Sequence, residues 1–225
     1  MGKFIDLTAK GGHSFGAYVA EPTDKPRGGL VVIQEIFGVN EHIRWVADGY
    51  AADGYYAVAP AMFDRSERGV EIGYEPADRE KGLALRKSLS DEEVLLDIGA
   101  AVETAKSAGK VGIVGYCFGG SMAWLSAARV PGLAAAVGYY GGQIASLLDE
   151  KPQCPVMLHF GETDPTIPVA DAEKVKAILE PAGIPVFIYP VAGHAFNRYG
   201  NQAWHEESAK LARERTLRFL QDHVG

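Results

Sequence analysis

Three side chains at widely separated positions could together carry out nucleophilic hydrolysis: Cys117, Asp164 and His194. A thiol with an ordinary pKa of about 8.5 is only slightly ionised at neutral pH, so it needs a neighbouring imidazole to accept its proton. A carboxylate beside that imidazole would fix its tautomer and offset its positive charge. These residue types predict a Cys-His-Asp triad that works through an acyl-enzyme.

The segment around Cys117 has the pattern of a nucleophile elbow. It reads Gly115-Tyr116-Cys117-Phe118-Gly119-Gly120, between a β-branched run and a helix-compatible segment. Such a strand–turn–helix exposes its nucleophile, and the flanking glycines allow the two backbones to pass closely. A helix beginning at Phe118 would offer free N–H groups that favour a thiolate and an oxyanion. Alone, the pattern fits equally well a glycine-rich turn with a buried cysteine.

The other two candidates also follow predicted strands. Asp164 lies in Gly161-Glu162-Thr163-Asp164-Pro165, where it could simply cap a turn, and His194 lies in a loop where it could be an ordinary polar residue. Three suitable residue types at three strand ends favour the triad, and the order nucleophile, acid, histidine is that of α/β-hydrolases. The remaining histidines lack this context: His13, His42, His159, His205 and His223. His159 sits in an apolar run and is expected in the core.

Strands and helices alternate through most of the chain. Strand patterns cover residues 4–8, 15–20, 29–34, 56–59, 111–114, 133–140, 156–160 and 186–189. Helical patterns cover residues 41–52, 76–88, 91–108, 118–128, 144–149, 169–179 and 203–222. This alternation predicts an α/β protein with a doubly wound, mostly parallel sheet, helices on both faces and an antiparallel N-terminal edge. Together with the order of the three candidate catalytic residues, it predicts the α/β-hydrolase fold. The irregular, charged connection over residues 61–75 is long enough to suggest a functional role.

Composition narrows the class of protein. The chain has 225 residues, 47% of them hydrophobic, which predicts one globular domain over residues 1–225. A net charge of -7 argues against nucleic acid as a partner. No segment predicts a membrane span or a signal peptide, so we expect a cytoplasmic protein. We also expect a monomer or a weak homo-oligomer. The two cysteines show no metal-ligand spacing, and we expect no metal or cofactor. Cys154 is expected to be a buried, inert thiol.

The chain resembles the dienelactone hydrolase family, the α/β-hydrolases with a catalytic cysteine. The resemblance rests on four stretches that span most of the chain: residues 34–40, 112–120, 138–141 and 192–198. It implies a triad of Cys117, Asp164 and His194, with an oxyanion hole formed by the backbone N–H groups of Ile36 and Phe118. It also implies hydrolysis of the enol-lactone carboxymethylenebutenolide in the degradation of aromatic compounds. Because family members also act as general esterases, a small-ester carboxylesterase is the alternative.

Charged residues near the candidate nucleophile suggest how it is controlled. Glu35 ends a strand, and in the resembled family this position contacts the nucleophile, where a carboxylate would disfavour the thiolate. Arg198 could pair with Glu35 or with a substrate carboxylate, since a guanidinium binds either in a bidentate manner. Arg79 matches by position the family's second carboxylate-binding arginine. We therefore expect a small ester or lactone substrate that could carry a carboxylate.

Departures from the family pattern keep other functions open. Ala195 stands where the family often has serine, and Leu83 and Arg86 stand where well-known members have aromatic residues. A non-catalytic ligand receptor would normally lack a member of the triad, whereas all three residues are present here. A redox-sensing thiol would need a resolving cysteine, and only Cys154 could provide it.

Overall fold

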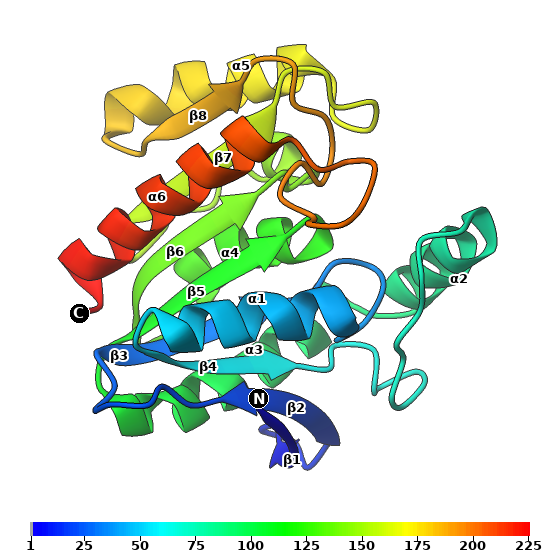
Figure 1. The fold of residues 1–225 in the computed structure, drawn as a ribbon, viewed down its shortest axis with the longest axis vertical. Coiled ribbons are helices and arrows are strands. Elements are labelled where there is room, and N and C mark those ends of the chain that lie inside the picture. Colours follow the sequence, from blue (N-terminus) through cyan, green and yellow to red (C-terminus); the bar gives the residue numbers. More distant parts are fainter. Residues whose placement is uncertain (1) are drawn as a thin grey trace.

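The fold is an eight-stranded sheet with helices on both faces (Figure 1). We analysed a computed structural model, which describes residues 2–225. The strand order is β1-β2-β4-β3-β5-β6-β7-β8. The first two pairings, β1 with β2 and β2 with β4, are antiparallel, and the remaining pairings are parallel. The mostly parallel sheet with an antiparallel N-terminal edge, predicted from the alternating pattern, is confirmed.

The boundaries of the elements follow the chain in order. The strands are β1 (Lys3–Thr8), β2 (Ser14–Ala20), β3 (Gly28–Ile33), β4 (Tyr55–Pro60), β5 (Val111–Tyr116), β6 (Leu133–Tyr139), β7 (Val156–Gly161) and β8 (Val186–Tyr189). The α-helices are α1 (Glu41–Ala52), α2 (Pro76–Lys87), α3 (Asp91–Ala105), α4 (Phe118–Arg129), α5 (Val169–Leu179) and α6 (Glu206–His223). Three 3₁₀ turns are η1 (Lys106–Ala108), η2 (Ile144–Ser146) and η3 (Glu180–Ala182).

Helices cover the sheet from both sides, which explains its apolar strands. In Figure 1, α1 and α6 lie in front of the sheet, while α3 and α4 lie behind it. Every residue of β3 and β5 is buried, as expected for central parallel strands that face helices on both sides. The core therefore runs through the middle of the sheet, and the candidate catalytic side chains lie where strands end.

Three predicted helices differ in extent from the observed ones. The predicted helix over residues 91–108 ends its α-helical part at Ala105, and Gly109, with φ of 118°, terminates the following 3₁₀ turn. The C-terminal helix begins at Glu206 rather than near residue 203, because the His205 side chain caps it by accepting a hydrogen bond from the Ser208 N–H. The helix predicted over residues 144–149 is only the 3₁₀ turn η2.

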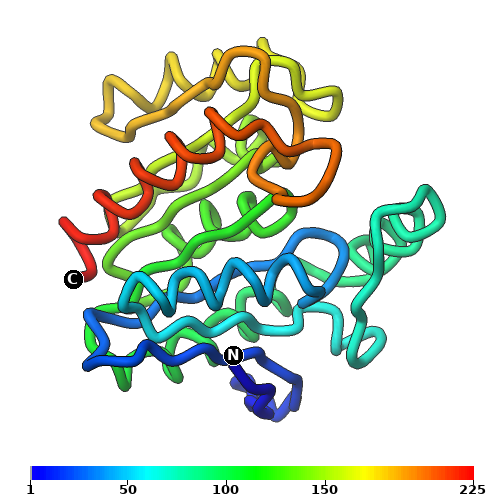
Figure 2. The backbone as a smooth tube through the Cα atoms, viewed as in Figure 1, coloured from blue at the N-terminus to red at the C-terminus, as the bar shows by residue number. Residues whose placement is uncertain are grey.

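Helix α2 stands apart from the rest of the fold, on the side toward which the arrowheads of the parallel strands point (Figures 1 and 2). One close contact seats it on the loop after β3. A Cβ added to Gly82 would lie 2.1 Å from the carbonyl oxygen of Ile36, so no larger residue fits there without displacement. The backbone of α2 therefore rests directly on the loop that carries Ile36.

The turn between β5 and α4 depends on a second close approach. A Cβ on Gly115 would lie 1.9 Å from the carbonyl oxygen of Gly119, and a Cβ on Gly119 would lie 2.5 Å from that of Ile33. Both opposing atoms are backbone and cannot rotate away. The glycines of the predicted elbow are thus required by packing between strand and helix, as the sequence pattern indicated.

We expect Gly115→Ala to lower the free energy of unfolding by about 3 kcal/mol or more, because the new methyl group meets fixed backbone atoms. The control is Gly99→Ala in α3, where an added Cβ has no neighbour within 4 Å. That variant should gain about 0.5 to 1 kcal/mol, the helix-propensity advantage of alanine over glycine. Urea unfolding of the three proteins checks both values, and equal stabilities for the two variants would contradict the packing argument.

Candidate active site

Cys117 sits at the tip of the turn between β5 and α4. Its backbone is in a strained conformation for a residue with a side chain, with φ of 56° and ψ of -114°, and it occupies the N-cap position of α4. The Cys117 N–H donates to the Tyr139 carbonyl oxygen at 3.0 Å, which ties the turn to the neighbouring strand. The thiol is partly exposed and lies beside the N-terminus of a buried helix, an environment that favours a negative charge.

His194 and Asp164 are brought together from two separate loops. The imidazole Nδ1 of His194 lies 2.7 Å from Oδ2 of Asp164. The other carboxylate oxygen, Oδ1, accepts hydrogen bonds from Thr166 N–H at 2.7 Å, from the Thr166 hydroxyl at 2.8 Å and from Ile167 N–H at 3.1 Å. Burial would raise the pKa of Asp164, but the hydrogen bond with His194 and the other donors outweigh it and lower the pKa. The carboxylate is therefore ionised and fixed in orientation.

The charged form of His194 is favoured by its neighbours. Burial lowers the pKa of the imidazole, but Asp164 and the nearby Cys117 together raise it to about 10. Both His194 and Cys117 line one cavity. No hydrogen bond of normal geometry joins Sγ to the imidazole in residues 2–225. The two side chains are nevertheless close enough for Cys117 to favour the charged imidazolium.

Two backbone N–H groups are free near the thiol. Within the described residues, the N–H groups of Ile36 and Phe118 donate to no other protein group. The loop that carries Ile36 is fixed on either side: before it, the Gly119 N–H donates to the Gln34 carbonyl at 3.1 Å and the Met62 N–H donates to the Gln34 side chain at 3.0 Å; after it, the Ile72 N–H donates to the Phe37 carbonyl at 3.1 Å. Rigid, unpaired donors of this kind can stabilise an oxyanion.

Glu35 and Arg198 form a buried ion pair beneath the cavity. Nε and one terminal nitrogen of Arg198 donate to the two oxygens of Glu35 at 3.0 and 2.8 Å. The guanidinium also stacks on the ring of Tyr74, with its carbon 4.1 Å from the ring centre. Burial would raise the pKa of Glu35, but Arg198, with smaller contributions from His42 and His194, lowers it. Glu35 is therefore ionised and both of its carboxylate oxygens are bound by Arg198. No hydrogen bond between Glu35 and Cys117 occurs in residues 2–225.

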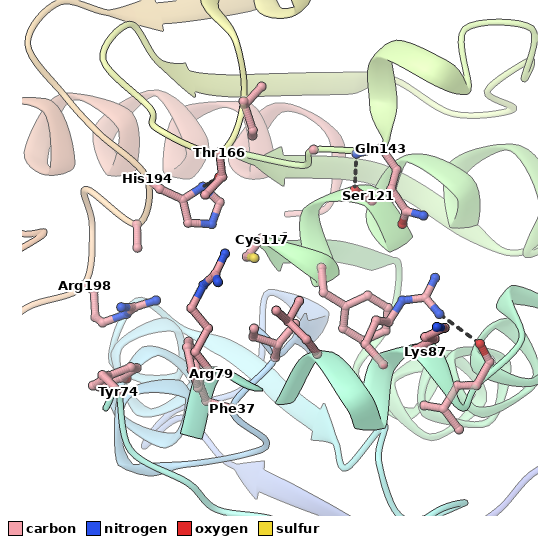
Figure 3. Close-up of a pocket in the computed structure, with 18 residues that line it drawn as sticks. Phe37, Tyr74, Arg79, Lys87, Cys117, Ser121, Gln143, Thr166, His194 and Arg198 are labelled. Carbon is pink, nitrogen blue, oxygen red and sulfur yellow. Dashed lines mark hydrogen bonds between the residues drawn. The ribbon is translucent and has the colours of Figure 1, made fainter. Parts of the chain in front are cut away.

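A cavity of about 780 Å³ connects these groups. It is lined by Cys117 and His194, by Ile36 and Phe118, and by Arg79 and Arg198; Asp164 and Glu35 lie behind their partners. Figure 3 shows the Arg79 side chain pointing toward the part of the cavity that Cys117 lines, and Arg79 forms no ion pair in the described part of the chain. The positions that depart from the family pattern also face this cavity: Leu83, Arg86 and Ala195.

The sequence did not single out three residues that shape the site. The Thr166 hydroxyl donates a hydrogen bond to the Asp164 carboxylate and lies 3.1 Å from Nδ1 of His194. The ring of Tyr74 stacks on the guanidinium of Arg198. His42 is buried near Glu35, and its Nε2 has no hydrogen-bond partner among residues 2–225. Only Thr166 carried a signal, its position two residues after Asp164. The other two depend on how distant segments fold together.

Several remaining expectations concern residues outside the cavity. His159 is fully buried, as predicted, and hydrogen-bonds the hydroxyls of Tyr189 and Thr216. Cys154 is only partly buried, contrary to expectation, although burial raises the pKa of its thiol to about 11. Among residues 2–225, no three His, Cys, Asp or Glu side chains are grouped to hold a metal ion. Across the same range, no helix combines the length and apolar character needed to span a bilayer.

Comparisons with known proteins agree with this arrangement. Residues 15–224 match the model of the dienelactone hydrolase family. The chain belongs to the dienelactone hydrolase family. It is 36% identical over 229 residues to a carboxymethylenebutenolidase of Pseudomonas putida, which covers 96% of this chain and 94% of that one. Carboxymethylenebutenolidase 1 of Cupriavidus pinatubonensis is 32% identical over 229 residues, with 96% and 95% covered.

Solved structures show the same fold. A Klebsiella pneumoniae protein assigned to the dienelactone hydrolases superimposes with a TM-score of 0.82 at 32% identity, covering 98% of this chain and 100% of that one. A dienelactone hydrolase-like promiscuous phosphotriesterase from metagenomic libraries gives a TM-score of 0.77 at 18% identity, covering 100% and 99%, and shows the fold alone. The predicted family and α/β-hydrolase fold are thus confirmed, and the protein is a carboxylic ester hydrolase.

The elevated pKa of His194 can be tested directly. An NMR titration of the wild type should give a pKa near 10 for this imidazole. The value should fall in Cys117→Ala and in Asp164→Asn, because each variant removes a group that favours the imidazolium. An unchanged pKa in both variants would contradict the proximity of the three side chains.

The same shift predicts how stability depends on pH. The folded pKa of His194 lies above the ordinary value of about 6.5 in an unfolded chain. The folded protein therefore holds this proton more tightly, and the contribution is fully present below about pH 6.5 and lost as the pH rises through about 10. Between pH 7 and 10 the wild type should lose more unfolding free energy than His194→Gln, as measured by denaturant unfolding.

Proposed function

We propose that this protein hydrolyses an enol-lactone or ester bond through a covalent acyl-enzyme on Cys117, with a dienelactone of the carboxymethylenebutenolide type as substrate. The observation that carries the proposal is the 2.7 Å contact between His194 and Asp164, in a cavity shared with a strained cysteine at a helix N-terminus. The names of the Pseudomonas and Cupriavidus relatives support the substrate.

In the first half of the reaction, His194 holds the proton taken from Cys117 as the imidazolium that its raised pKa favours, and Sγ attacks the carbonyl carbon of the substrate. The carbonyl π electrons move onto the oxygen, which accepts hydrogen bonds from the N–H groups of Ile36 and Phe118. When the carbonyl re-forms, the C–O bond to the leaving oxygen breaks and His194 returns its proton to that oxygen. Opening of a lactone leaves the whole substrate attached as a thioester, with an enol that can become a ketone.

In the second half, water attacks the thioester. His194 accepts a proton from the water while the same two N–H groups hold the new oxyanion. The C–S bond breaks and its electron pair returns to Sγ, so that Cys117 and the protonated His194 recover their starting state. The acid product loses its remaining proton to solvent and leaves as a carboxylate. Asp164 remains ionised throughout, because its carboxylate accepts stabilising hydrogen bonds. This carboxylate in turn fixes the orientation of the imidazole and offsets the positive charge of the imidazolium.

A carboxylate on the substrate would explain the buried ion pair. Arg198 lines the cavity although it is paired with Glu35 beneath it, and Arg79 approaches from α2. We infer that a bound carboxylate takes up both arginines and loosens Glu35, whose negative charge otherwise opposes ionisation of the thiol. Selectivity for an anion must come from such local cations, because the chain as a whole carries a net charge of -7.

A second candidate function is the hydrolysis of small esters without a carboxylate. The cavity of about 780 Å³ falls toward the upper end of the range of about 300 to 1,000 Å³ typical of ligand pockets. Ala195 contributes no hydroxyl, and Leu83 is 45% exposed at the cavity wall, so part of the wall accepts apolar groups. These features favour a tolerant site over one fitted to a single lactone.

A thiol-based redox switch is disfavoured by the fold. Cys117 follows the carboxyl end of β5, whereas Cys154 precedes the amino end of β7, and these strands run parallel in one sheet. The two residues are therefore separated by the length of a six-residue strand, about 20 Å at about 3.3 Å per residue. A disulfide requires Cα atoms less than about 7 Å apart. Cys154 cannot serve as a resolving thiol in this structure.

The triad predicts a specific pattern of lost activity. Cys117→Ala and His194→Ala should each lower kcat/KM on p-nitrophenyl acetate by about a thousandfold or more, since the members of a triad act as a unit. Asp164→Asn should cost somewhat less, because that residue orients the base rather than reacting. Purified variants with native circular dichroism, assayed over pH 6 to 9, provide the measurement.

The matched control is Cys154→Ala, which removes a thiol remote from the cavity and should keep wild-type turnover. Near-normal activity in Cys117→Ala would rule out covalent catalysis at this cysteine. Little loss in His194→Ala would make Glu35 the leading candidate for the base.

The arginine pair predicts substrate selectivity. Removing Arg79 should lower kcat/KM on a carboxylated lactone by about ten- to a hundredfold and affect a neutral aryl ester far less, because a charge-assisted hydrogen bond is worth about 1.5 to 3 kcal/mol. Arg198→Met should be combined with Glu35→Gln, since the single variant would leave a buried carboxylate unpaired. The double variant should also lose selectivity for the carboxylated substrate.

Arg68→Ala is the control for a general loss of positive charge, because Arg68 is exposed and pairs with Asp6 outside the cavity. It should leave both rates unchanged. An equal loss on both substrates in Arg79→Ala would show that this arginine supports the structure of the site rather than binding a carboxylate.

A further inference from the structure

The walls of the cavity are unusually rich in positive charge. Besides His194, the described residues that line it include four arginine or lysine side chains and no carboxylate: Arg79, Arg86, Lys87 and Arg198. A single substrate carboxylate bound by two arginines uses only part of this charge. The remaining cations raise the question of what else the cavity binds.

Two of the four charges are already neutralised by the protein. Arg198 is paired with Glu35. Arg86 is paired with Asp91, donates to the Leu89 carbonyl at 3.0 Å and lies over the Phe118 ring. These contacts fix Arg86 as part of the wall.

Arg79 and Lys87 carry the uncompensated charge. Neither side chain forms an ion pair or hydrogen bond with any group in residues 2–225, although both line the cavity. A substrate anion could therefore bind either of them without displacing a carboxylate of the protein.

Arg79 and Lys87 lie toward opposite ends of the cavity. Both belong to α2, eight residues apart, which corresponds to about 12 Å along a helix that rises about 1.5 Å per residue. Figure 3 shows Arg79, Arg198 and Tyr74 on one side of Cys117, with Gln143 above and Lys87 below on the other side. A substrate whose reacting carbonyl sits at Cys117 can extend toward both ends.

The end near Lys87 also offers a neutral donor. Gln143 lines the cavity, and its backbone N–H donates to the Ser121 hydroxyl at 3.1 Å, which fixes the position of the residue above the cavity floor. Its side-chain amide forms no hydrogen bond in the described part of the chain. An ammonium group and an amide facing one space are suited to the two oxygens of a carboxylate.

We propose that Lys87 and Gln143 form a second anion subsite, so that the preferred substrates are dianionic esters or lactones with one anionic group on each side of the scissile bond. This inference rests on the proposed function, because it takes Cys117 as the reacting centre. One anion binds at Arg79 and Arg198, and the other binds at Lys87 and Gln143. A substrate with only one carboxylate leaves the second subsite unused.

Lys87 also has a purely structural role available, because it is the last residue of α2 and a cation there stabilises the helix dipole. Lys81 on the same helix is a matched control: it pairs with Glu67 and does not line the cavity. Loss of helix stability would lower activity on all substrates alike. Loss of an anion subsite changes the preference between substrates.

The experiment uses four aryl esters: phenyl acetate, 4-carboxyphenyl acetate, monophenyl glutarate and mono-(4-carboxyphenyl) glutarate. They carry no carboxylate, one on the leaving group, one on the acyl group, or one on each. Values of kcat/KM, corrected for uncatalysed hydrolysis, are measured for the wild type, Lys87→Ala, Gln143→Ala and Lys81→Ala. The preference ratio is kcat/KM for the doubly carboxylated ester divided by kcat/KM for whichever singly carboxylated ester reacts faster.

We expect the wild type to prefer the doubly carboxylated ester and Lys87→Ala to lower this ratio by about three- to tenfold, a modest effect because Lys87 is exposed to solvent. Gln143→Ala should lower the ratio less, and Lys81→Ala should not change it. Raising the salt concentration should reduce the wild-type preference but not that of Lys87→Ala.

A wild type without this preference, an unchanged ratio in Lys87→Ala, or an equal fall in Lys87→Ala and Lys81→Ala would each overturn the second subsite. None of these outcomes affects the proposed function as long as the wild type hydrolyses the esters and Cys117→Ala does not. Undiminished turnover in Cys117→Ala would overturn the proposed function instead.

Discussion

The close packing of β5 against the start of α4 is the constraint on which the rest of the site depends. Gly115 and Gly119 let strand and helix approach so nearly that a single Cβ would overlap a backbone oxygen. The chain can turn within this space only if Cys117 adopts a positive φ. The same turn leaves the Phe118 N–H unpaired, while the Gly119 N–H binds the Gln34 carbonyl and draws in the loop with Ile36. One packing contact thus positions the thiol and both candidate oxyanion donors.

The buried pair of Glu35 and Arg198 adds a charged layer beneath this rigid turn. Burying two charges is costly, and such a pair often stabilises a protein no more than apolar residues of similar size would. Here the geometry is bidentate and Tyr74 stacks on the guanidinium, so the protein itself satisfies both charges of the pair. Its value is better explained by function: Arg198 reaches the cavity wall, and any anion that binds it competes with Glu35.

Much of this arrangement could be predicted from the sequence because strand ends are easy to locate. Apolar runs end where Cys117, Asp164 and His194 follow, and in a parallel sheet all carboxyl ends lie at one edge. The fold class and the grouping of these residues follow from that rule. The starts and ends of helices were less predictable, since the His205 cap that delays α6 depends on a side-chain hydrogen bond rather than on a pattern of apolar residues.

Other features could not be read from the sequence because they depend on long connections. Tyr74 lies in the irregular segment before α2, and nothing in the local sequence indicates that this segment passes over Arg198. His42 looked like an ordinary helix residue, yet the fold places it close to Glu35. Lys87 ends α2, between β4 and α3, whereas Gln143 lies in the loop after β6, and only the folded arrangement of these distant segments brings both residues to one cavity.

The seating of α2 links substrate recognition to the oxyanion donors. The helix carries Arg79 and Lys87, and its backbone at Gly82 lies against the carbonyl of Ile36, whose unpaired N–H is one of the two candidate oxyanion donors. A shift of α2 must therefore move or strain the Ile36 peptide, because the contact is between backbone atoms. Anions bound at both ends of α2 would hold the helix against this loop and keep the Ile36 N–H in place. The charge of the substrate can thus influence the reaction itself as well as binding.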